Sequence, residues 1–456
     1  MGSLLRGTLR SLALVAAGFA GGAFATGAAS ATPEGESPYA LLDQMARVLV
    51  LVENEYVEPV DRARLVEGAI KGMVSELDPH SAYLTAEEFN IFQSDTQGSF
   101  GGIGVEVDFG DDAVIVIAPI EGSPAHRAGV RPGDRIIAID GRSVRGKSPE
   151  DLIRTMRGEP GTEVALTIRR DGTEKLKHFK LKREVIRVSS IRAKLLDRNV
   201  GYLRIKQFQI GTHEELLAAV GELRAEADGD LAGILLDMRN NPGGLVDEAA
   251  AVADEFLSGG VIYTTRHRGR IVEEFRAGPK GSLRRGPVVV LVNEYSASAA
   301  ELVAGALQDH RRAPIVGAQT FGKGSVQTII DLPGGAGLRL TTMRYYTPGG
   351  HTIQALGIKP SVVIQAAYAE DRSFGVVREA DLEGHLPADG KPSEKAPAEA
   401  DAARAGDDES SGPKAEGGDE THLGVAREIP ADPTGGPDFQ LSVAYQIVTG
   451  VMTMTK

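Results

Sequence analysis

Residues 288–309 read VVVLVNEYSASAAELVAGALQD, and this stretch decides the fold. Its first five residues are apolar and mostly β-branched, which predicts a buried strand. The second half places Ala299, Val303, Ala306 and Leu307 at helical spacing, so we expect a helix to follow. Ser298 would then lie where the strand gives way to a helix N-terminus, whose unpaired backbone N–H groups can hold an oxyanion.

A lysine lies between two glycines in a second segment, TFGKGSVQ at residues 320–327. Ser298 and Lys323 together suggest a catalytic dyad, because a serine hydroxyl needs a base to become a nucleophile and a neutral lysine can serve. Lowering a lysine pKa from about 10.4 to about 7 or 8 costs roughly 4 kcal/mol. A dyad therefore requires a dry and well-supported site.

The same residues also have purely structural interpretations. Ser298 and Glu301 have the spacing of a capping box, which would explain both without catalysis. Lys323 between glycines would be an exposed turn lysine. Local sequence leaves these interpretations open.

Three segments, 293–301, 304–309 and 320–327, together resemble the active-site signature of the carboxy-terminal processing proteases, a family of tail-specific serine peptidases. The resemblance implies that Ser298 is the nucleophile and Lys323 the base. It also implies that Gln327 orients the lysine.

Residues 237–245, DMRNNPGGL, follow the apolar run at 233–236 and resemble a further segment of that family. The resemblance implies an oxyanion hole that combines the N–H of Gly243 or Gly244 with the N–H of Ala299. Taken alone, the segment is typical of a Pro-Gly turn that ends a strand.

Composition narrows the classes of function. A chain of 456 residues is too long for one ordinary domain, and its net charge of −13 disfavours nucleic acid or an anionic membrane as the main partner. The absence of cysteine excludes thiol catalysis, disulfides and thiolate metal sites. No His-Glu-x-x-His motif occurs, and we expect neither a metal nor a cofactor.

The N-terminus has the pattern of an export signal over residues 1–31. Arg6 and Arg10 precede an uncharged stretch, and Ala29-Ser30-Ala31 fits a small-residue cleavage site. The expected location is therefore periplasmic. The uncharged stretch would span about 28 Å as a helix, so an uncleaved anchor in the inner membrane is the alternative.

Residues 98–184 alternate short strands and turns and resemble a PDZ domain. The resemblance makes Gly102-Ile103-Gly104-Val105 a carboxylate-binding loop, with a bound peptide pairing to the adjoining strand edge.

Apolar residues such as Leu41, Met45 and Val48 recur at helical spacing in residues 38–95. Residues 32–97 resemble the family's N-terminal helical segment, which often takes part in dimer contacts, although amphipathic helices that pack on their own domain are the commoner case. From the resemblance, a homo-oligomer is expected.

The remaining chain divides by composition. Alternating strands and helices over 185–368 predict an α/β core, which the resemblance implies is the protease core. Residues 369–436 are rich in Ala, Asp, Glu, Gly and Pro and predict a disordered acidic linker, while 437–456 predict a C-terminal helix that docks on the body or on a partner. The expected fold class is α+β multidomain, with an N-terminal helical segment, a PDZ domain inserted before an α/β serine-protease core, and a disordered acidic C-terminal linker.

The leading functional hypothesis is an exported serine endopeptidase. It would recognise the C-terminal region of protein or peptide substrates through the PDZ domain, with or without an adaptor protein, and cleave peptide bonds with a Ser/Lys dyad. One alternative is a catalytically inactive PDZ scaffold that only binds peptides. Another uses His310, beside Asp309, as the base, but no Gly-x-Ser-x-Gly elbow surrounds Ser298.

Overall fold

A computed structural model describes residues 38–110, 112–173, 175–365, 376–389 and 429–454. The expected export signal lies outside these ranges, as does most of the expected acidic linker. Within them, no helix is both long enough and apolar enough to cross a membrane. Contacts divide the chain into two units, residues 1–72 and residues 73–456.

The described part of the first unit consists of helix α2 (Pro38–Glu55) and most of helix α3 (Arg62–Ser75). Their apolar side chains are largely exposed, Leu41 for example by 64%. The two helices line an apolar groove of about 490 Å³, formed by Leu41, Gln44, Met45, Val48, Leu49, Val52, Leu65, Val66 and Ala69. The apolar periodicity of this segment therefore predicts helices correctly, although the pair does not bury its own apolar face.

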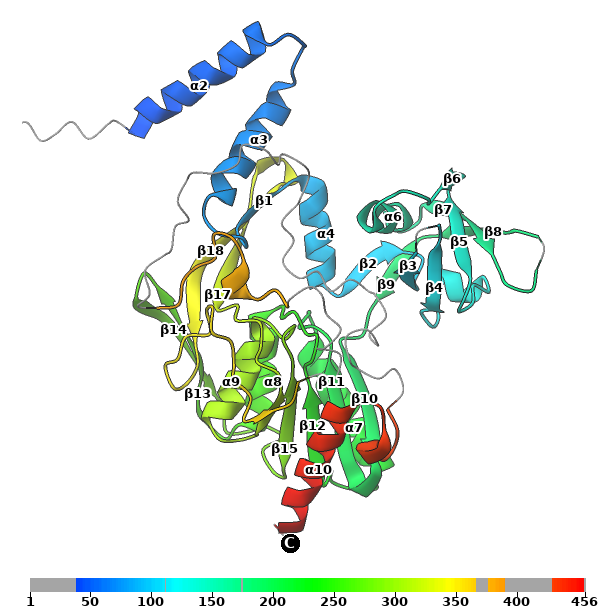
Figure 1. Ribbon diagram of the computed structural model, residues 1–456, viewed down its shortest axis with the longest axis vertical. Helices are drawn as coiled ribbons and strands as arrows, with labels where there is room; N and C mark the ends of the chain where they lie inside the picture. Colours follow the sequence, from blue (N-terminus) through cyan, green and yellow to red (C-terminus); the bar gives the residue numbers. More distant parts are fainter. Residues whose placement is uncertain (1–37, 111, 174, 366–375, 390–428, 455–456) are drawn as a thin grey trace, which may run out of the picture. The chain divides into compact units, whose positions relative to one another are not determined.

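The inserted domain begins and ends at one pair of antiparallel strands, β2 (Ser99–Gly102) and β9 (Glu184–Arg187). Between them runs an antiparallel sheet in the order β3-β4-β5-β7-β8, with β6 paired to β5 and with two short helices (Figure 1). The bounds are β3 (Val105–Phe109), β4 (Val114–Pro119), α5 (Pro124–Arg127), β5 (Arg135–Ile139), β6 (Arg142–Ser143), α6 (Pro149–Met156), β7 (Glu163–Arg169) and β8 (Lys177–Lys182). Alternate strand residues bury a separate apolar core.

The larger domain is built on a sheet in the order β10-β11-β12-β15-β16-β19. Adjacent strands of this sheet pair in parallel, except that β10 pairs with β11 in antiparallel orientation. The strands are β10 (Ile191–Leu196), β11 (Val200–Ile205), β12 (Gly233–Asp237), β15 (Val288–Val292), β16 (Ile315–Gly317) and β19 (Val362–Val363). Such strands are buried on both faces, which explains the continuous apolar run at 288–292.

Helices cover both faces of this sheet. Alternate residues of β15, Val288, Val290 and Val292, join one core with α7 (Thr212–Glu226), α8 (Val246–Phe256) and α9 (Ala299–Asp309). Val289 and Leu291 join another core with α10 (Phe439–Met454), so the C-terminal helix packs against the sheet.

A second, antiparallel sheet contains β1, β18, β13 and β14, with β17 paired to β18. Its strands are β1 (Ala82–Leu84), β13 (Gly260–His267), β14 (Arg270–Ala277), β17 (Ser325–Asp331) and β18 (Gly337–Tyr346), and helix α4 (Ala86–Thr96) follows β1. Strand β17 begins directly after Lys323-Gly324. The lysine therefore lies where the α/β core passes into this sheet.

The prediction of a disordered linker over residues 369–436 is wrong for two parts of that range. Residues 376–389, which we call the strap, are described and contain the 3-10 turn η4 (Glu379–Asp381), and Glu379 is fully buried. Residues 429–436 contain the turn η6 (Pro433–Gly435), and Ile429 is buried in the core with α10. Composition does not predict the strap, because hydrogen bonds and ion pairs hold it and these produce no apolar periodicity in the sequence.

Candidate active site

Ser298 occupies the turn between β15 and α9, where the strand-to-helix pattern places it. Its backbone has φ 52° and ψ −113°, which is outside the regions that residues other than glycine normally adopt. A capping serine has an extended backbone instead. Strain of this kind requires support from the surrounding structure and is concentrated at functional sites. The elbow conformation thus occurs here without the flanking glycines that usually signal it.

Glu301, in the first turn of α9, connects the serine turn with the lysine loop, residues 320–324. Its Oε2 accepts hydrogen bonds from the backbone N–H of Ser298 at 2.7 Å and of Lys323 at 2.9 Å. Its Oε1 accepts from the Thr320 hydroxyl at 2.5 Å and the Gly322 N–H at 2.7 Å. The predicted interaction between Ser298 and Glu301 is therefore present, but the same carboxylate also holds the lysine.

No cation pairs directly with the Glu301 carboxylate in the described structure. Burial raises the pKa of Glu301 to about 7, although its four hydrogen-bond donors act in the opposite direction. The carboxyl group is fully buried. This group therefore titrates near neutral pH.

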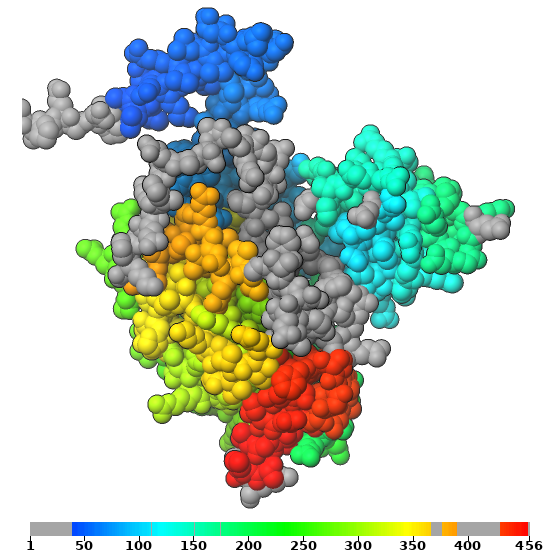
Figure 2. Space-filling model, in the orientation of Figure 1, coloured from blue at the N-terminus to red at the C-terminus, as the bar shows by residue number. Residues whose placement is uncertain are grey.

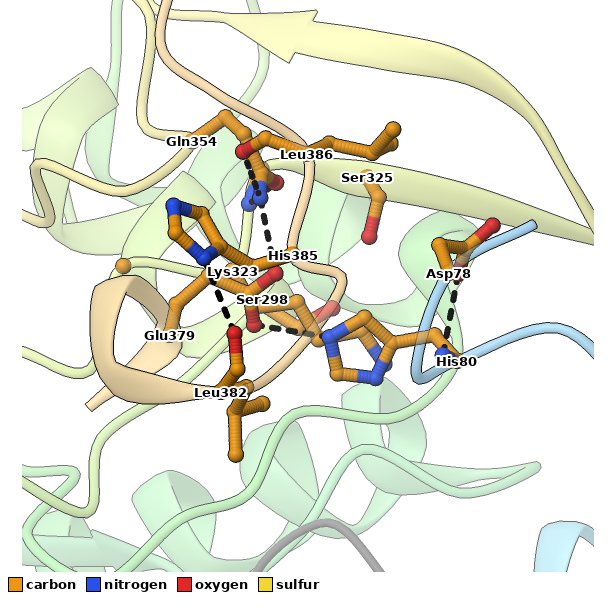
Figure 3. Close-up of polar contacts among 12 residues, drawn as sticks. Asp78, His80, Ser298, Lys323, Ser325, Gln354, Glu379, Leu382, His385 and Leu386 are labelled. Atoms are coloured by element: carbon orange, nitrogen blue, oxygen red, sulfur yellow. Dashed lines mark hydrogen bonds and ion pairs between the residues drawn. The ribbon is translucent and has the colours of Figure 1, made fainter. Parts of the chain in front are cut away.

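Lys323 lies beside Ser298, as Figure 3 shows, and their backbone N–H groups share one oxygen of Glu301. Burial, together with the positive charge of Arg339, lowers the pKa of Lys323 to about 8, against the opposing effect of Glu379, Asp78 and Glu301. A lysine with this pKa is substantially neutral in mildly alkaline solution. It can then accept a proton.

Gln327 lies on β17, and its amide contacts hydroxyl groups. Its Nε2 donates to Ser325 Oγ at 3.0 Å and to Thr341 Oγ1 at 3.3 Å. Thr341 in turn donates to Asp78 Oδ1 at 3.0 Å. Among the described contacts, none is a hydrogen bond from Gln327 to Lys323, so the structure connects Gln327 to the charges around the lysine only through Thr341.

The glycine turn after β12 lies against Ser298. A Cβ atom on Gly243 would come within 2.8 Å of Ser298 Cβ and 3.0 Å of the Ala299 nitrogen, and its φ of 105° also requires glycine. The Gly243 N–H donates to Asn241 Oδ1 at 2.9 Å. In the described chain, the N–H groups of Gly244 and Ala299 have no hydrogen-bond acceptor, which leaves these two available.

The loop that carries these glycines is anchored by a buried cluster of charges. Arg239 donates to Asp237 Oδ2 at 2.6 Å and to both carboxylate oxygens of Asp438 at 2.8 Å. Tyr202 donates to Asp237 at 2.8 Å. Asp438 precedes α10, so the C-terminal helix contributes directly to holding this loop. The cluster was not predicted from the sequence, although charged residues at the end of an apolar strand, such as Asp237 and Arg239, were a signal.

The predicted peptide-binding residues, Gly102 to Val105, connect β2 with β3. The Ile103 carbonyl accepts from the Ala125 N–H, and the Gly104 carbonyl accepts from Ile120 and Ser123. In the described structure, the N–H groups of Ile103 and Gly104 have no protein acceptor. The loop therefore directs its carbonyls to the protein and keeps two donors available.

His310 is not near the serine along α9. Ser298 and His310 flank opposite ends of this 11-residue helix, which is about 16 Å long. The His310 Nε2 contacts the Val261 carbonyl at 2.6 Å, and Asp309 accepts from the Gly349 N–H at 2.8 Å. Both side chains have structural partners, so a triad based on His310 receives no support.

Sequence comparison defines the class of protein. Residues 199–364 match peptidase family S41, residues 115–170 match the PDZ domain, and residues 24–88 match the activating protease CtpB N-terminal domain. The chain is therefore a serine-type peptidase with a PDZ domain.

Individual relatives specify the family. The carboxy-terminal-processing protease of Bartonella bacilliformis is 39% identical over 422 residues, which are 92% of this chain and 90% of that protein. A probable CtpA-like serine protease of Staphylococcus aureus is 41% identical over 327 residues, 71% of this chain and 64% of that protein. The solved photosystem II D1 C-terminal processing protease is 30% identical with a TM-score of 0.46, covering 72% of this chain and 87% of its own. The Bartonella match shows that the chain belongs to the carboxy-terminal processing protease family, which confirms the resemblance. The described helices and strands confirm the α+β multidomain fold.

Proposed function

We propose that this protein is an exported endopeptidase that binds the C-terminal region of protein substrates through its PDZ domain and cleaves them with a Ser298/Lys323 dyad. The observation that carries the proposal is the single Glu301 oxygen that accepts the N–H groups of both residues. The strained backbone of Ser298 and the lowered pKa of Lys323 support it independently.

In the proposed mechanism, the neutral amine of Lys323 takes the proton of Ser298 as Oγ attacks the scissile carbonyl. The oxyanion lies between the Ala299 N–H and the 243–244 turn, where backbone donors stabilise the developing charge. As the tetrahedral intermediate collapses, the Lys323 ammonium gives its proton to the leaving amine. Water, deprotonated by Lys323, then hydrolyses the acyl ester and restores Ser298.

Two features support recognition of a substrate C-terminus, namely the PDZ match at residues 115–170 and the backbone donors of the loop before β3. Ile103 and Gly104 present backbone N–H groups in the loop before β3, and such donors suit a carboxylate. PDZ domains bind peptides by adding a strand at an exposed sheet edge. A peptide with a free C-terminus is therefore the proposed ligand, delivered with or without an adaptor protein.

The first unit supports the proposal of a homo-oligomer. Helices α2 and α3 expose apolar side chains around a groove of about 490 Å³. A second copy would bury this surface, which an isolated helix pair leaves in water. Export to the periplasm is proposed from the pattern of residues 1–31, with an uncleaved membrane anchor as the alternative.

The test is cleavage of an unstructured protein with an apolar C-terminus by the purified protein. The Ser298→Ala and Lys323→Ala variants, each checked for folding and for peptide binding, should lose cleavage by roughly a thousandfold. Binding without cleavage by the unmodified protein would favour the scaffold alternative. Undiminished cleavage by a folded Ser298→Ala variant would refute the dyad.

A further inference from the structure

The strap, residues 376–389, is bonded to the lysine loop and to β18. The Arg378 side chain donates to the Thr320 carbonyl, and the Glu379 N–H donates to the Phe321 carbonyl at 3.2 Å. At the other end, Asp389 accepts hydrogen bonds from side chains of β18, those of Arg344 and Tyr346. Figure 2 shows the strap in orange against the yellow surface of the preceding segment.

Glu379 is the buried centre of the strap. Its carboxylate is fully buried, with Oε1 accepting from Gln354 at 2.7 Å and Oε2 lying 2.7 Å from His80 Nε2. Figure 3 shows these side chains converging beside Lys323 and Ser298. A buried carboxylate is costly without such partners. Docking of the strap therefore depends on residues from two distant parts of the chain.

Gln354 connects Glu379 with the lysine loop through hydrogen bonds to both. Its Nε2 donates to Glu379 and to the Leu386 carbonyl, and its Oε1 accepts from the Gly324 N–H at 3.0 Å. The strap thus fixes the carbonyls before Lys323, and Gln354 fixes the N–H after it. The lysine backbone is held from both sides.

We propose that Glu379 is a positioning residue for Lys323, acting through Gln354 and the docked strap. The inference rests on the proposed function, in which Lys323 is the base. Loss of the Glu379 contacts would let the lysine loop shift while the sheet and its helices remain folded. Small displacements of a catalytic group cost large factors in rate.

The charge of Glu379 provides a second signature. The charged groups that act on Lys323 are Arg339 of β18, which lowers its pKa, and Glu379, Asp78 and Glu301, which raise it. Removing the negative charge at residue 379 lowers the pKa of Lys323 further, so the acid limb of the pH–rate profile moves to lower pH. A purely structural role for Glu379 would not move that limb.

The experiment measures kcat, KM and pH profiles of the full chain on one peptide substrate. Glu379→Ala should lower kcat roughly tenfold to a hundredfold, with KM within about twofold of the unmodified value. The isosteric Glu379→Gln should retain more activity and move the acid limb to lower pH. Glu383→Gln, an identical change at an exposed strap position, should behave like the unmodified protein.

A double variant tests the route through Gln354. If Glu379 acts through Gln354, adding Glu379→Ala to Gln354→Ala should cost little more than either change alone. Fully additive losses would refute this route. A folded Glu379→Ala variant with unchanged kcat would refute the positioning role.

If the Glu379→Ala variant does not fold, the Glu379→Gln variant tests the positioning role instead. An unchanged kcat together with an unmoved acid limb in that variant would refute the proposal. In the same assay, the Ser298→Ala and Lys323→Ala variants distinguish a failure of the proposed dyad from a failure of the proposed role of Glu379. Cleavage by these variants would refute the dyad itself. Loss of cleavage in them, with normal activity in the Glu379 variants, would refute only the role of Glu379.

Discussion

Two buried carboxylates, Asp237 and Glu301, support the two sides of the active site. Their pKa values are shifted in opposite directions. Asp237 anchors the glycine turn and pairs with Arg239, whose charge and hydrogen bonds outweigh burial and lower the pKa of Asp237. Glu301 connects the serine turn with the lysine loop and has only neutral donors. Burial dominates there and raises the pKa of Glu301 to about 7.

The comparison shows that burial alone does not decide the charge of a group. Both residues are fully inaccessible, yet the directly paired Arg239 keeps Asp237 ionised, while Glu301, which has no directly paired cation in the described structure, is close to neutralisation. The Asp237 cluster is a permanent anchor. The Glu301 contact holds together the two residues of the proposed dyad, and the charge that it places beside them changes with pH near neutrality.

Breaking the permanent anchor should have the largest effect. Arg239→Met leaves Asp237 and Asp438 buried without their cation, and we expect a loss of about 3–5 kcal/mol in the free energy of unfolding. Denaturant-induced unfolding measures it. Arg239→Lys is the matched control, which keeps the charge but loses the paired hydrogen bonds, and should lose less. A Met variant within about 1 kcal/mol of the unmodified protein would contradict the assigned role.

The two carboxylates should also respond to pH with opposite signs. The folded protein retains a proton on Glu301 that the unfolded chain releases above its pKa of 4.5. The stability that this provides is complete below that value and falls by about 3 kcal/mol as pH rises through 7. Asp237 has a lowered pKa, so its contribution is present above 3.8 and is lost as pH falls.

Glu301→Gln isolates this effect. The variant should unfold with a flatter dependence on pH between about 4.5 and 7 than the unmodified protein. Its amide nitrogen cannot accept the backbone N–H groups that Glu301 accepts in the unmodified protein, so we expect kcat to fall roughly tenfold or more. Glu383→Gln, on the exposed side of the strap, controls for loss of a carboxylate. An identical pH slope in the Glu301 variant would refute the assigned titration.

Local patterns account for much of the predicted fold. The apolar run at 288–292 and the helical spacing after Ser298 involve neighbours in sequence, so they predict β15, α9 and the junction between them. The C-terminal helix follows from a similar pattern, whereas the PDZ domain was expected from the resemblance of residues 98–184. The strain at Ser298 could not be predicted, because the residue carries no glycine signal and its backbone is fixed by Glu301 and by the adjoining turn.

Contacts between distant residues were also outside the reach of the sequence. The Arg239 side chain meets Asp438 199 positions later, and His80 meets Glu379 299 positions later. Neither pair creates a periodic pattern. Glu379 also lies in a stretch whose composition is typical of disorder, so its burial depends entirely on partners that the fold brings together.

The smallest expected effect concerns the pH at which Lys323 becomes an effective base. Because the neutral amine is required, kcat/KM should rise with pH through about 8 and then level off. Arg339 opposes the ammonium form, so Arg339→Gln should raise the pKa of Lys323 and move this limb to higher pH, by less than about one unit. That direction is opposite to the shift expected for Glu379→Gln. The exposed Arg270→Gln variant, which removes the same charge from β14, should leave the limb in place. A shift of the same sign in the Arg339 and Glu379 variants would mean that the limb does not report on Lys323, since charges of opposite sign must move one titration in opposite directions.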